Sequence, residues 1–292
     1  MKYNRIFLFI ILSFFLLSCN NKKEEYSTDA PNRGEITIHY DDSFSNVAEA
    51  LTYRYMKFYP ETKINLQISK EDKALEDLLN HKVRLIIMSR ELTETERRLY
   101  DSKIKLKWQP AYFAADAVCF VVNKNSSLSS VSLAEIKQML SSKERKLIFD
   151  GSNTSNLNAI VQKLQLDPKK IEYSVIKGNE NIIKNLEKFP NHIGVISFNT
   201  ISRPFGEKAI QLRESIKILP MKVGEEDVLP TKENLKTQKY PLTKILYFLT
   251  NEPYFGLGNG LIRFSCTQIG QLIVDKQGLQ PFYIFPRTVE MR

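Results

Sequence analysis

The chain has 292 residues, 42% of them hydrophobic and 26% charged, which suits one large globular domain or two of ordinary size and excludes a disordered or low-complexity protein. Lysine and arginine exceed aspartate and glutamate by 42 to 33. These charges are mixed along the chain and form no basic stripe with interleaved aromatics, which argues against nucleic-acid binding.

The N-terminal segment has the pattern of a secretory signal. A cationic start precedes an apolar run over residues 6–17, which is shorter than the roughly 20 residues of a membrane span. The run ends in the sequence LLSC at residues 16–19, which resembles the bacterial lipobox, where a signal peptidase cuts before a lipid-modified cysteine. We predict a signal peptide over residues 1–18, lipid on Cys19 and a flexible polar tether over residues 19–33. An ordinary signal peptide with a chance cysteine is the alternative.

The predicted location is the cell envelope of a Gram-negative-type bacterium. A Lys-Lys-Glu-Glu cluster at residues 22–25 resembles a surface-export signal, so the lipid anchor stands on either the periplasmic face or the cell surface. The remaining cysteines, Cys119 and Cys266, lie in apolar segments. Two cysteines far apart suggest no disulfide framework, and two buried free thiols are expected, although a pair stays open.

Strand and helix patterns alternate along the rest of the chain. Apolar or alternating segments predict strands at residues 36–38, 64–68, 83–88, 117–122, 147–149 and 193–198. Helical spacing falls between them, at residues 47–58, 75–79, 133–140, 157–164 and 182–186, and capping boxes indicate helix starts at Asn46, Thr93 and Ser132. This rhythm is typical of an α/β protein with largely parallel sheets, which bind ligands beyond the carboxyl ends of their strands.

Four predicted strands are followed by loops rich in hydroxyl groups, at residues 41–46, 69–72, 89–91 and 150–155. A helix N-terminus carries free N–H groups and a partial positive charge, so it favours an oxyanion, and adjacent hydroxyl groups would complete a cage. Simple helix capping explains any one such loop. Four loops in corresponding places favour an anion site, to which Arg90 adds a charged, bidentate donor.

Several segments resemble, in order and spacing, the phosphate-binding proteins of ABC phosphate importers, over about residues 34–285. The segments are DDSFSNVAEALTYRYMKFYPETKINLQIS, VRLIIMSREL, FAADAVCFVVNK, FDGSNTS, PNHIGVISF, YPLTKILYFLTNEP and GLGNGLIRFSCTQIGQLIVDKQGLQP. The resemblance implies a type II periplasmic-binding-protein fold, in which two lobes, each a mostly parallel sheet flanked by helices, hold the ligand in the cleft between them. The lobes are predicted at residues 34–112 plus 246–292 and at residues 113–245.

The resemblance also implies the ligand-binding residues: Ser43, Phe44 through its N–H group, Ser69, Ser89, Arg90, Asp116, Ser152, Asn153 and Thr154. The chain departs from the family at three positions. Asn153 replaces a glycine, Ile148 stands where an arginine is frequent, and Arg90 replaces an aspartate that accepts the proton of monohydrogen phosphate. Asp42 and Asp116 are the remaining candidates for that acceptor, so the anion class is better defined than phosphate itself.

The predicted function is a monomeric, lipid-anchored binding protein that captures inorganic phosphate for the permease subunits of an ABC importer, without a cofactor. Two alternatives stay open. The first is a surface protein that captures or senses phosphate or another tetrahedral oxyanion without transport. The second is a metal-dependent hydrolase centred on residues 39–42, but the 3 histidines show no metal-ligand spacing and no nucleophile elbow or phosphate loop occurs, so no catalytic or metal site is predicted.

Overall fold

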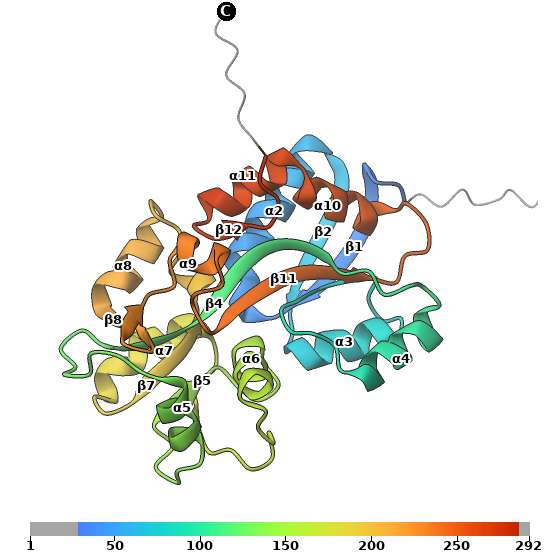
Figure 1. Cartoon of the computed structure of the whole chain (residues 1–292). Helices are drawn as coiled ribbons and strands as arrows, with labels where there is room; N and C mark the ends of the chain where they lie inside the picture. The colour runs from blue at the N-terminus through green and yellow to red at the C-terminus, as the bar shows by residue number, and fades with distance from the viewer. Residues whose placement is uncertain (1–28, 286–292) are drawn as a thin grey trace, which may run out of the picture.

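The computed structural model describes residues 29–285. The predicted signal peptide, Cys19 and most of the predicted tether therefore lie outside the described residues. A mixed sheet runs through the described part of the chain, in the strand order β2-β1-β3-β11-β4-β7-β5-β6, and β8 and β12 also pair with β4 (Figure 1). Its strands are β1 (Arg33–Tyr40), β2 (Glu61–Ile68), β3 (Leu85–Met88), β4 (Ala111–Asn123), β5 (Leu147–Phe149), β6 (Ser174–Val175), β7 (Ile193–Ser197), β8 (Ile216–Leu219), β11 (Thr243–Thr250) and β12 (Gln280–Pro281).

Helices pack against the sheet in both of its halves (Figure 1). They are α2 (Ser45–Phe58), α3 (Glu71–Leu79), α4 (Glu94–Ile104), α5 (Leu133–Leu140), α6 (Ser155–Leu164), α7 (Asn179–Asn185), α8 (Glu207–Ser215), α9 (Lys232–Lys236), α10 (Leu257–Cys266) and α11 (Gln268–Lys276). Short 3₁₀ turns occupy Asp42–Phe44, Leu186–Lys188 and Phe198–Thr200, and β9 (Met221–Val223) pairs with β10 (Glu226–Val228) as a separate hairpin. We call β1–β3 with their helices the first half and β5–β7 with theirs the second half.

The sheet is parallel at its two ends and antiparallel in the middle. In the first half β1 pairs in parallel with β2 and β3, and in the second half β5 pairs in parallel with β6 and β7. The long strands β4 and β11 join the halves and run antiparallel to each other and to their neighbours β7 and β3. The predicted α/β binding-protein fold is confirmed, and the predicted lobe boundaries stay a prediction.

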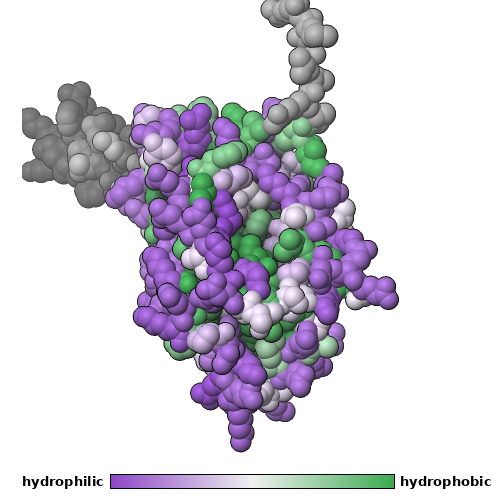
Figure 2. All heavy atoms as spheres, turned by 90° about the vertical axis from the view of Figure 1, so that its left-hand side faces the viewer, coloured by the Kyte–Doolittle hydropathy of each residue, from purple (hydrophilic) through white to green (hydrophobic). Residues whose placement is uncertain are grey.

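Three hydrophobic cores hold the sheet and helices together. One lies in the second half around the C-terminal part of β4, a second lies between β1, α2, α10 and α11, and a third lies between β3, α3 and α4. Hydrophilic side chains cover most of the face shown in Figure 2, and hydrophobic ones appear between them in the middle and along the upper edge. Both cysteines are free thiols, Cys119 buried and Cys266 partly exposed.

The capping boxes predicted at Thr93 and Ser132 are confirmed, whereas the one predicted at Asn46 is wrong. The 3₁₀ turn after β1 runs directly into α2, so Ser45 already begins this helix and its hydroxyl donates to the Asp42 carbonyl. Asn46 therefore lies inside the helix, where its side-chain amide donates to the Asn199 carbonyl at 2.8 Å. This bond ties α2 to the turn after β7, which belongs to the second half.

A close backbone contact near the C-terminal end gives the first prediction. Gly278 has φ +83°, and a Cβ atom there would lie 1.9 Å from the Ser202 carbonyl oxygen. Gly224 has φ +63° with open space around it. We expect Gly278→Ala to lower the free energy of unfolding by at least about 2 kcal/mol because it adds a backbone clash to the left-handed strain, and Gly224→Ala by about 1 kcal/mol. Equal losses in urea titrations of the two variants would contradict this packing.

Candidate functional site

The four predicted loops meet where the two halves of the sheet face each other. The loops after β1, β2 and β3 come from the first half, and the loop after β5 leads into α6 in the second half. The hydroxyl oxygens of Ser89 and Ser155 lie 2.7 Å apart, so the third loop touches the start of α6. The carboxyl ends of these strands therefore form one junction, as expected for such sheets.

Asp41 joins the two halves through its carboxylate. One oxygen accepts a hydrogen bond from the Ser43 N–H at 3.1 Å, and the other accepts one from the N–H of Ser155, the first residue of α6, at 3.1 Å. Burial, together with the nearby carboxylates of Asp150 and Glu71, raises the pKa of Asp41 to about 8. A helix N-terminus that could bind an oxyanion is thus occupied by a carboxyl group of the chain itself.

Glu71 makes a similar arrangement from the first turn of α3. One of its oxygens accepts hydrogen bonds from both the N–H and the hydroxyl of Ser89, at 2.7 and 2.8 Å. The other accepts from the side-chain amide of Asn158 in α6, at 3.0 Å. Both polar groups of Ser89, a predicted anion donor, therefore donate to an internal carboxylate.

Lys244 places a buried positive charge beside this junction. It lies on β11 with 2% of its surface exposed, and its ammonium donates to the Ser155 hydroxyl and the Asn156 side-chain carbonyl, both at 3.0 Å. It also lies 5.4 Å from the centre of the Phe44 ring and forms an ion pair with Asp116 at 3.3 Å. Burial of this charge is compatible with folding because each contact favours a cation.

Asp116, a predicted ligand-binding residue, is held by several donors. In addition to the Lys244 ion pair, its carboxylate accepts hydrogen bonds from the Ser197 hydroxyl and from the Asn199 N–H. Asn199 lies in the 3₁₀ turn after β7, and its side-chain amide donates to the Ser43 carbonyl at 3.0 Å. Asp116 thus connects β4 to the turn that contacts the first anion loop.

Ser43 has a fully buried hydroxyl without a hydrogen-bond partner among the described residues. The Oδ1 atom of its neighbour Asn199 has none either. The N–H of Phe44, which was predicted to contact the anion, donates to the Asp41 carbonyl at 2.9 Å and so closes the 3₁₀ turn. An unpaired buried hydroxyl costs about 1–3 kcal/mol, so a ligand that accepts a hydrogen bond from Ser43 would remove this cost.

A hollow of about 460 Å³ opens beside the junction. Its polar lining is supplied by Asp41, Asp42, Ser69, Lys70, Asp150, Thr154, Lys177 and Asn181. The Thr154 hydroxyl donates a hydrogen bond to Asp150 at 2.9 Å, which lowers the pKa of that carboxyl group. Burial has the larger, opposite effect and raises the pKa of Asp150 to about 6. The Lys70 ammonium donates to the Ser152 hydroxyl at 3.2 Å and so connects the second loop to the fourth.

Arg90 lies at the edge of the buried junction, where its Nε is 3.8 Å from a Glu71 oxygen, whereas the exposed part of the fourth loop lies outside it. The Arg90 guanidinium pairs with Asp72 and Glu96, each at 2.8 Å, and although burial opposes its charge, the contacts with Glu96 and Glu71 raise the pKa of Arg90. Asn153 has φ +58°, a left-handed conformation that favours glycine and that asparagine also adopts. Ser152 and Asn153 are exposed. Five predicted residues are therefore buried at the junction, namely Ser43, Phe44, Ser89, Asp116 and Thr154.

Six residues that organise the site were not predicted from the sequence, namely two carboxylates, one lysine and three neutral polar residues: Asp41, Glu71, Lys244, Ser155, Asn156 and Asn158. Signals for most of them existed. Asp41 and Glu71 stand in the first and second loops, and Ser155 closes the fourth. Lys244 was visible as one charged residue within the apolar strand LTKILYFLT, where a buried lysine needs partners.

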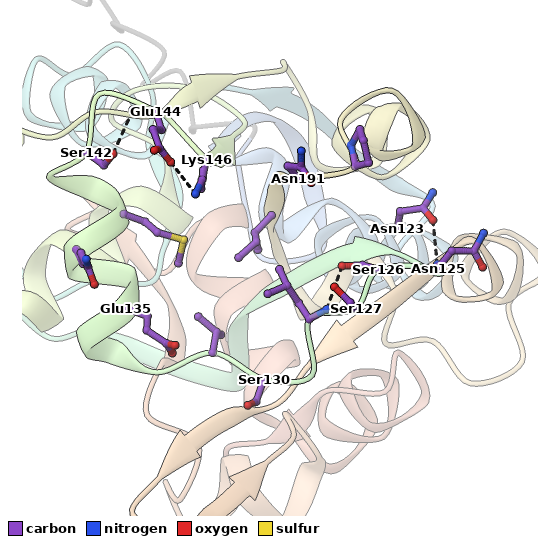
Figure 3. Close-up of a pocket in the computed structure, with 16 residues that line it drawn as sticks. Asn123, Asn125, Ser126, Ser127, Ser130, Glu135, Ser142, Glu144, Lys146 and Asn191 are labelled. Carbon is purple, nitrogen blue, oxygen red and sulfur yellow. Dashed lines mark hydrogen bonds and ion pairs between the residues drawn. The ribbon is translucent and has the colours of Figure 1, made fainter.

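A second hollow, of about 890 Å³, lies at the far end of β4 and is lined by neutral residues such as Asn123, Ser127 and Ser130 (Figure 3). Its charged groups are paired: Glu135 accepts hydrogen bonds from Ser132 in a capping box, and Glu144 pairs with Lys146 at 2.6 Å. None of the four predicted anion loops lines this hollow, so the loop junction is the better candidate site.

Two further findings concern metals and membranes. Between residues 29 and 285, no three His, Cys, Asp or Glu side chains are arranged to hold a metal ion. Within the same residues, no helix is both long enough and apolar enough to cross a membrane.

Comparisons with known proteins agree with this fold. The sequence matches the family model described as a PBP superfamily domain over residues 26–268. It is 22% identical over 299 residues to the phosphate-binding protein PstS of Borreliella burgdorferi, covering 95% of this chain and 98% of that protein. It is 20% identical to the PstS of Pseudomonas aeruginosa, covering 88% of this chain and 86% of that protein.

Solved structures show the same relationship. One is a phosphate ABC transporter substrate-binding protein of Clostridium perfringens with bound phosphate, which matches with a TM-score of 0.70 and 18% identity over 86% of this chain and 100% of that one. A phosphate transport receptor of Vibrio cholerae matches with a TM-score of 0.64 and 16% identity over 85% of this chain and 100% of that one. The resemblance inferred from the sequence is confirmed, and at these identities the structures establish the fold alone.

The buried carboxyl group of Asp41 gives a prediction about pH. In the unfolded chain it loses its proton near the ordinary value of 3.8, and in the folded protein near pH 8. The folded state therefore holds this proton more tightly, and the resulting stabilisation is lost as pH rises from about 4 through 8. We expect the free energy of unfolding of Asp41→Asn, followed by urea titration from pH 5 to 9, to fall less steeply with pH than that of the unchanged protein. The exposed Asp227→Asn is the control, and parallel pH profiles for all three proteins would contradict the assignment.

Proposed function

This chain belongs to the PBP superfamily, and we propose that it is a lipid-anchored extracytoplasmic solute-binding protein that captures inorganic phosphate for an ABC importer. The relatives from Borreliella and Pseudomonas are named phosphate-binding proteins, and the Clostridium structure holds phosphate. The lipobox-like sequence ending at Cys19 supports the anchor, although it lies outside the described residues. Phosphate, a permease and the membrane are the proposed partners, with the chain acting as a monomer and not as an enzyme.

The observation that carries this proposal is the Ser43 hydroxyl. It belongs to the first predicted anion loop, it is fully buried at the junction of the two halves, and it has no hydrogen-bond partner among the described residues. A hydroxyl held in this way donates readily to an oxyanion because binding removes the cost of leaving it unpaired. Asp41 connects the Ser43 N–H to the start of α6, so an anion at this position would reach both halves.

The internal carboxylates occupy the positions that an oxyanion would take. Oxygens of Asp41 and Glu71 accept hydrogen bonds from the N–H of Ser155 and from the N–H and hydroxyl of Ser89. N–H groups at a helix start and serine hydroxyls are the donors that bind phosphate in proteins. We propose that phosphate displaces these carboxylates and that Lys244 supplies the positive charge that the missing family arginine would provide.

Selectivity for phosphate follows from the same carboxyl groups. Monohydrogen phosphate can donate its proton to a buried carboxylate, whereas sulfate has no proton to donate near neutral pH and would face an unpaired negative charge. Asp42 and Asp116 remain the proposed acceptors. Asp42 accepts hydrogen bonds from the N–H and the side-chain amide of Asn179 but still lines the hollow beside the junction.

A second candidate function is capture or sensing of phosphate without transport. Asp41 and Glu71 link the two halves themselves, because both accept hydrogen bonds from α6. Such internal contacts compete with phosphate and lower its apparent affinity, which suits a sensor better than a high-affinity importer. Deletion of the gene separates the two functions: loss of phosphate uptake by cells supports import, and unchanged uptake supports capture or sensing.

Binding of phosphate by Ser43 is testable with a single atom change. Ser43→Ala removes the unpaired hydroxyl, so we expect it to weaken binding of inorganic phosphate about 2- to 10-fold without loss of folding stability, since one neutral hydrogen bond contributes about 0.5–1.5 kcal/mol. Equilibrium dialysis with labelled phosphate measures the effect, and Ser127→Ala in the second hollow is the matched control. Unchanged affinity in the Ser43 variant would remove this residue from the proposed site.

Lipid attachment gives a separate prediction. If Cys19 is acylated, cells expressing the protein should incorporate labelled palmitate into it, and Cys19→Ser should abolish the label and release the protein from the membrane fraction. Cys266→Ser is the control because that thiol lies within the folded part of the chain. If the protein without any substitution takes up no label and is found in the soluble fraction, the predicted lipid anchor is wrong.

A further inference from the structure

An exposed surface of the first half combines aromatic rings with positive charges. We call it the aromatic–basic face and define it by Tyr53, Arg54, Lys57, Phe58, Phe255 and Arg263. The first four lie in the C-terminal part of α2, and the last two lie in and just before α10. The helices α2, α10 and α11 pack against one another, so these residues belong to one region of the molecule, near the top of Figure 1.

Each ring of this face carries a cation over it. Arg54 lies 4.8 Å from the centre of the Phe58 ring, and Lys57 lies 5.3 Å from that of Tyr53. Arg263 lies 5.9 Å from the Phe255 ring. The rings nevertheless remain exposed, by 62% for Tyr53, 45% for Phe58 and 54% for Phe255. Aromatic rings beside basic side chains are the combination found where proteins meet the headgroup region of a membrane.

The face is continuous and basic. Two surface hollows of about 620 and 950 Å³ share Phe58 and Ile269, so they join into one surface. Their charged lining consists of the cations Arg54, Arg203, Arg263 and Lys276 and the single acid Glu49. This excess of positive charge would repel a basic partner and attract an anionic surface.

The chain enters the folded region at the edge of this face. Pro31 lines the first hollow, and its carbonyl accepts a hydrogen bond from the Tyr55 hydroxyl. Asp29, where the described chain begins, accepts one from the Tyr254 hydroxyl at 3.0 Å, immediately before Phe255. Cys19 is ten residues earlier in the sequence, and ten extended residues span at most about 35 Å. Lipid on Cys19 would therefore keep this face within that distance of the membrane.

We propose that the aromatic–basic face lies directly on a membrane surface that contains anionic lipid. The proposal rests on the lipid anchor of the proposed function for its proximity to the bilayer, and on the charge and exposed rings of the face for its orientation. Basic side chains would contact lipid phosphates, and the rings would enter the headgroup layer. The junction between the two halves lies at the other end of α2, beyond Ser45, and stays open to solvent.

Hydrogen exchange of the protein anchored to vesicles by its lipid tests this orientation. The acylated protein, purified from membranes, is placed in vesicles of phosphatidylcholine alone or of phosphatidylcholine with phosphatidylglycerol. We expect slower exchange in peptides covering residues 53–59 and 254–263 on the anionic vesicles and not on the neutral ones. The triple variant Arg54→Gln, Lys57→Gln, Arg263→Gln should lose this protection.

The control replaces three exposed lysines of the second half, Lys143→Gln, Lys163→Gln and Lys169→Gln, which should keep the protection. Thermal unfolding of both triple variants checks that they fold. If the protein proves to carry no acyl group, flotation with the same vesicles replaces anchoring, and binding to anionic vesicles should weaken at least tenfold in the face variant, because it lacks three positive charges. Equal exchange or equal flotation on both vesicle types, or a face that is protected only by a permease, would overturn the proposal.

Discussion

The Asp41 carboxyl group is the buried contact on which the proposed site between the two halves depends. It accepts one hydrogen bond from the loop that follows β1 and one from the first N–H group of α6. Glu71 repeats the arrangement between Ser89 and Asn158. Because helix starts and serine hydroxyls attract oxyanions, we propose that these carboxyl groups mark the positions of the oxygens of a bound tetrahedral anion.

Several acidic side chains lie in one buried region, so their negative charge must be balanced by cations, hydrogen-bond donors or bound protons. Asp116 obtains this balance from Lys244 and from donors on the turn after β7. Asp41 carries less negative charge because it holds its proton, as its raised pKa indicates. Arg90 contributes to this balance through Glu71, whose oxygen lies 3.8 Å from the Arg90 Nε, while Asp72 and Glu96 hold the rest of the guanidinium. A ligand that brings its own proton fits such a site better than one that brings only negative charge, which is the physical reason to favour phosphate over sulfate.

Much of the fold was predictable because its signals are local. Apolar runs located the buried strands, and Ser132 with Glu135 located a helix start. The meeting of the loops was predictable from the carboxyl-end rule for parallel strands. The direction of the acidic side chains was not, because Glu71 in a first helical turn has the same sequence pattern whether it faces water or Ser89. The partners of Lys244 come from β4 and α6, and no local pattern records contacts between segments so far apart in sequence.

We propose that phosphate takes the place of the Asp41 and Glu71 carboxyl groups between the two halves. A crystal structure of the protein grown with inorganic phosphate tests this exchange most directly. We expect phosphate within hydrogen-bonding distance of the Ser43 hydroxyl and the Ser155 N–H, with the Asp41 carboxyl group turned away from α6. Phosphate bound only elsewhere, with Asp41 still accepting the hydrogen bond from Ser155, would rule the exchange out.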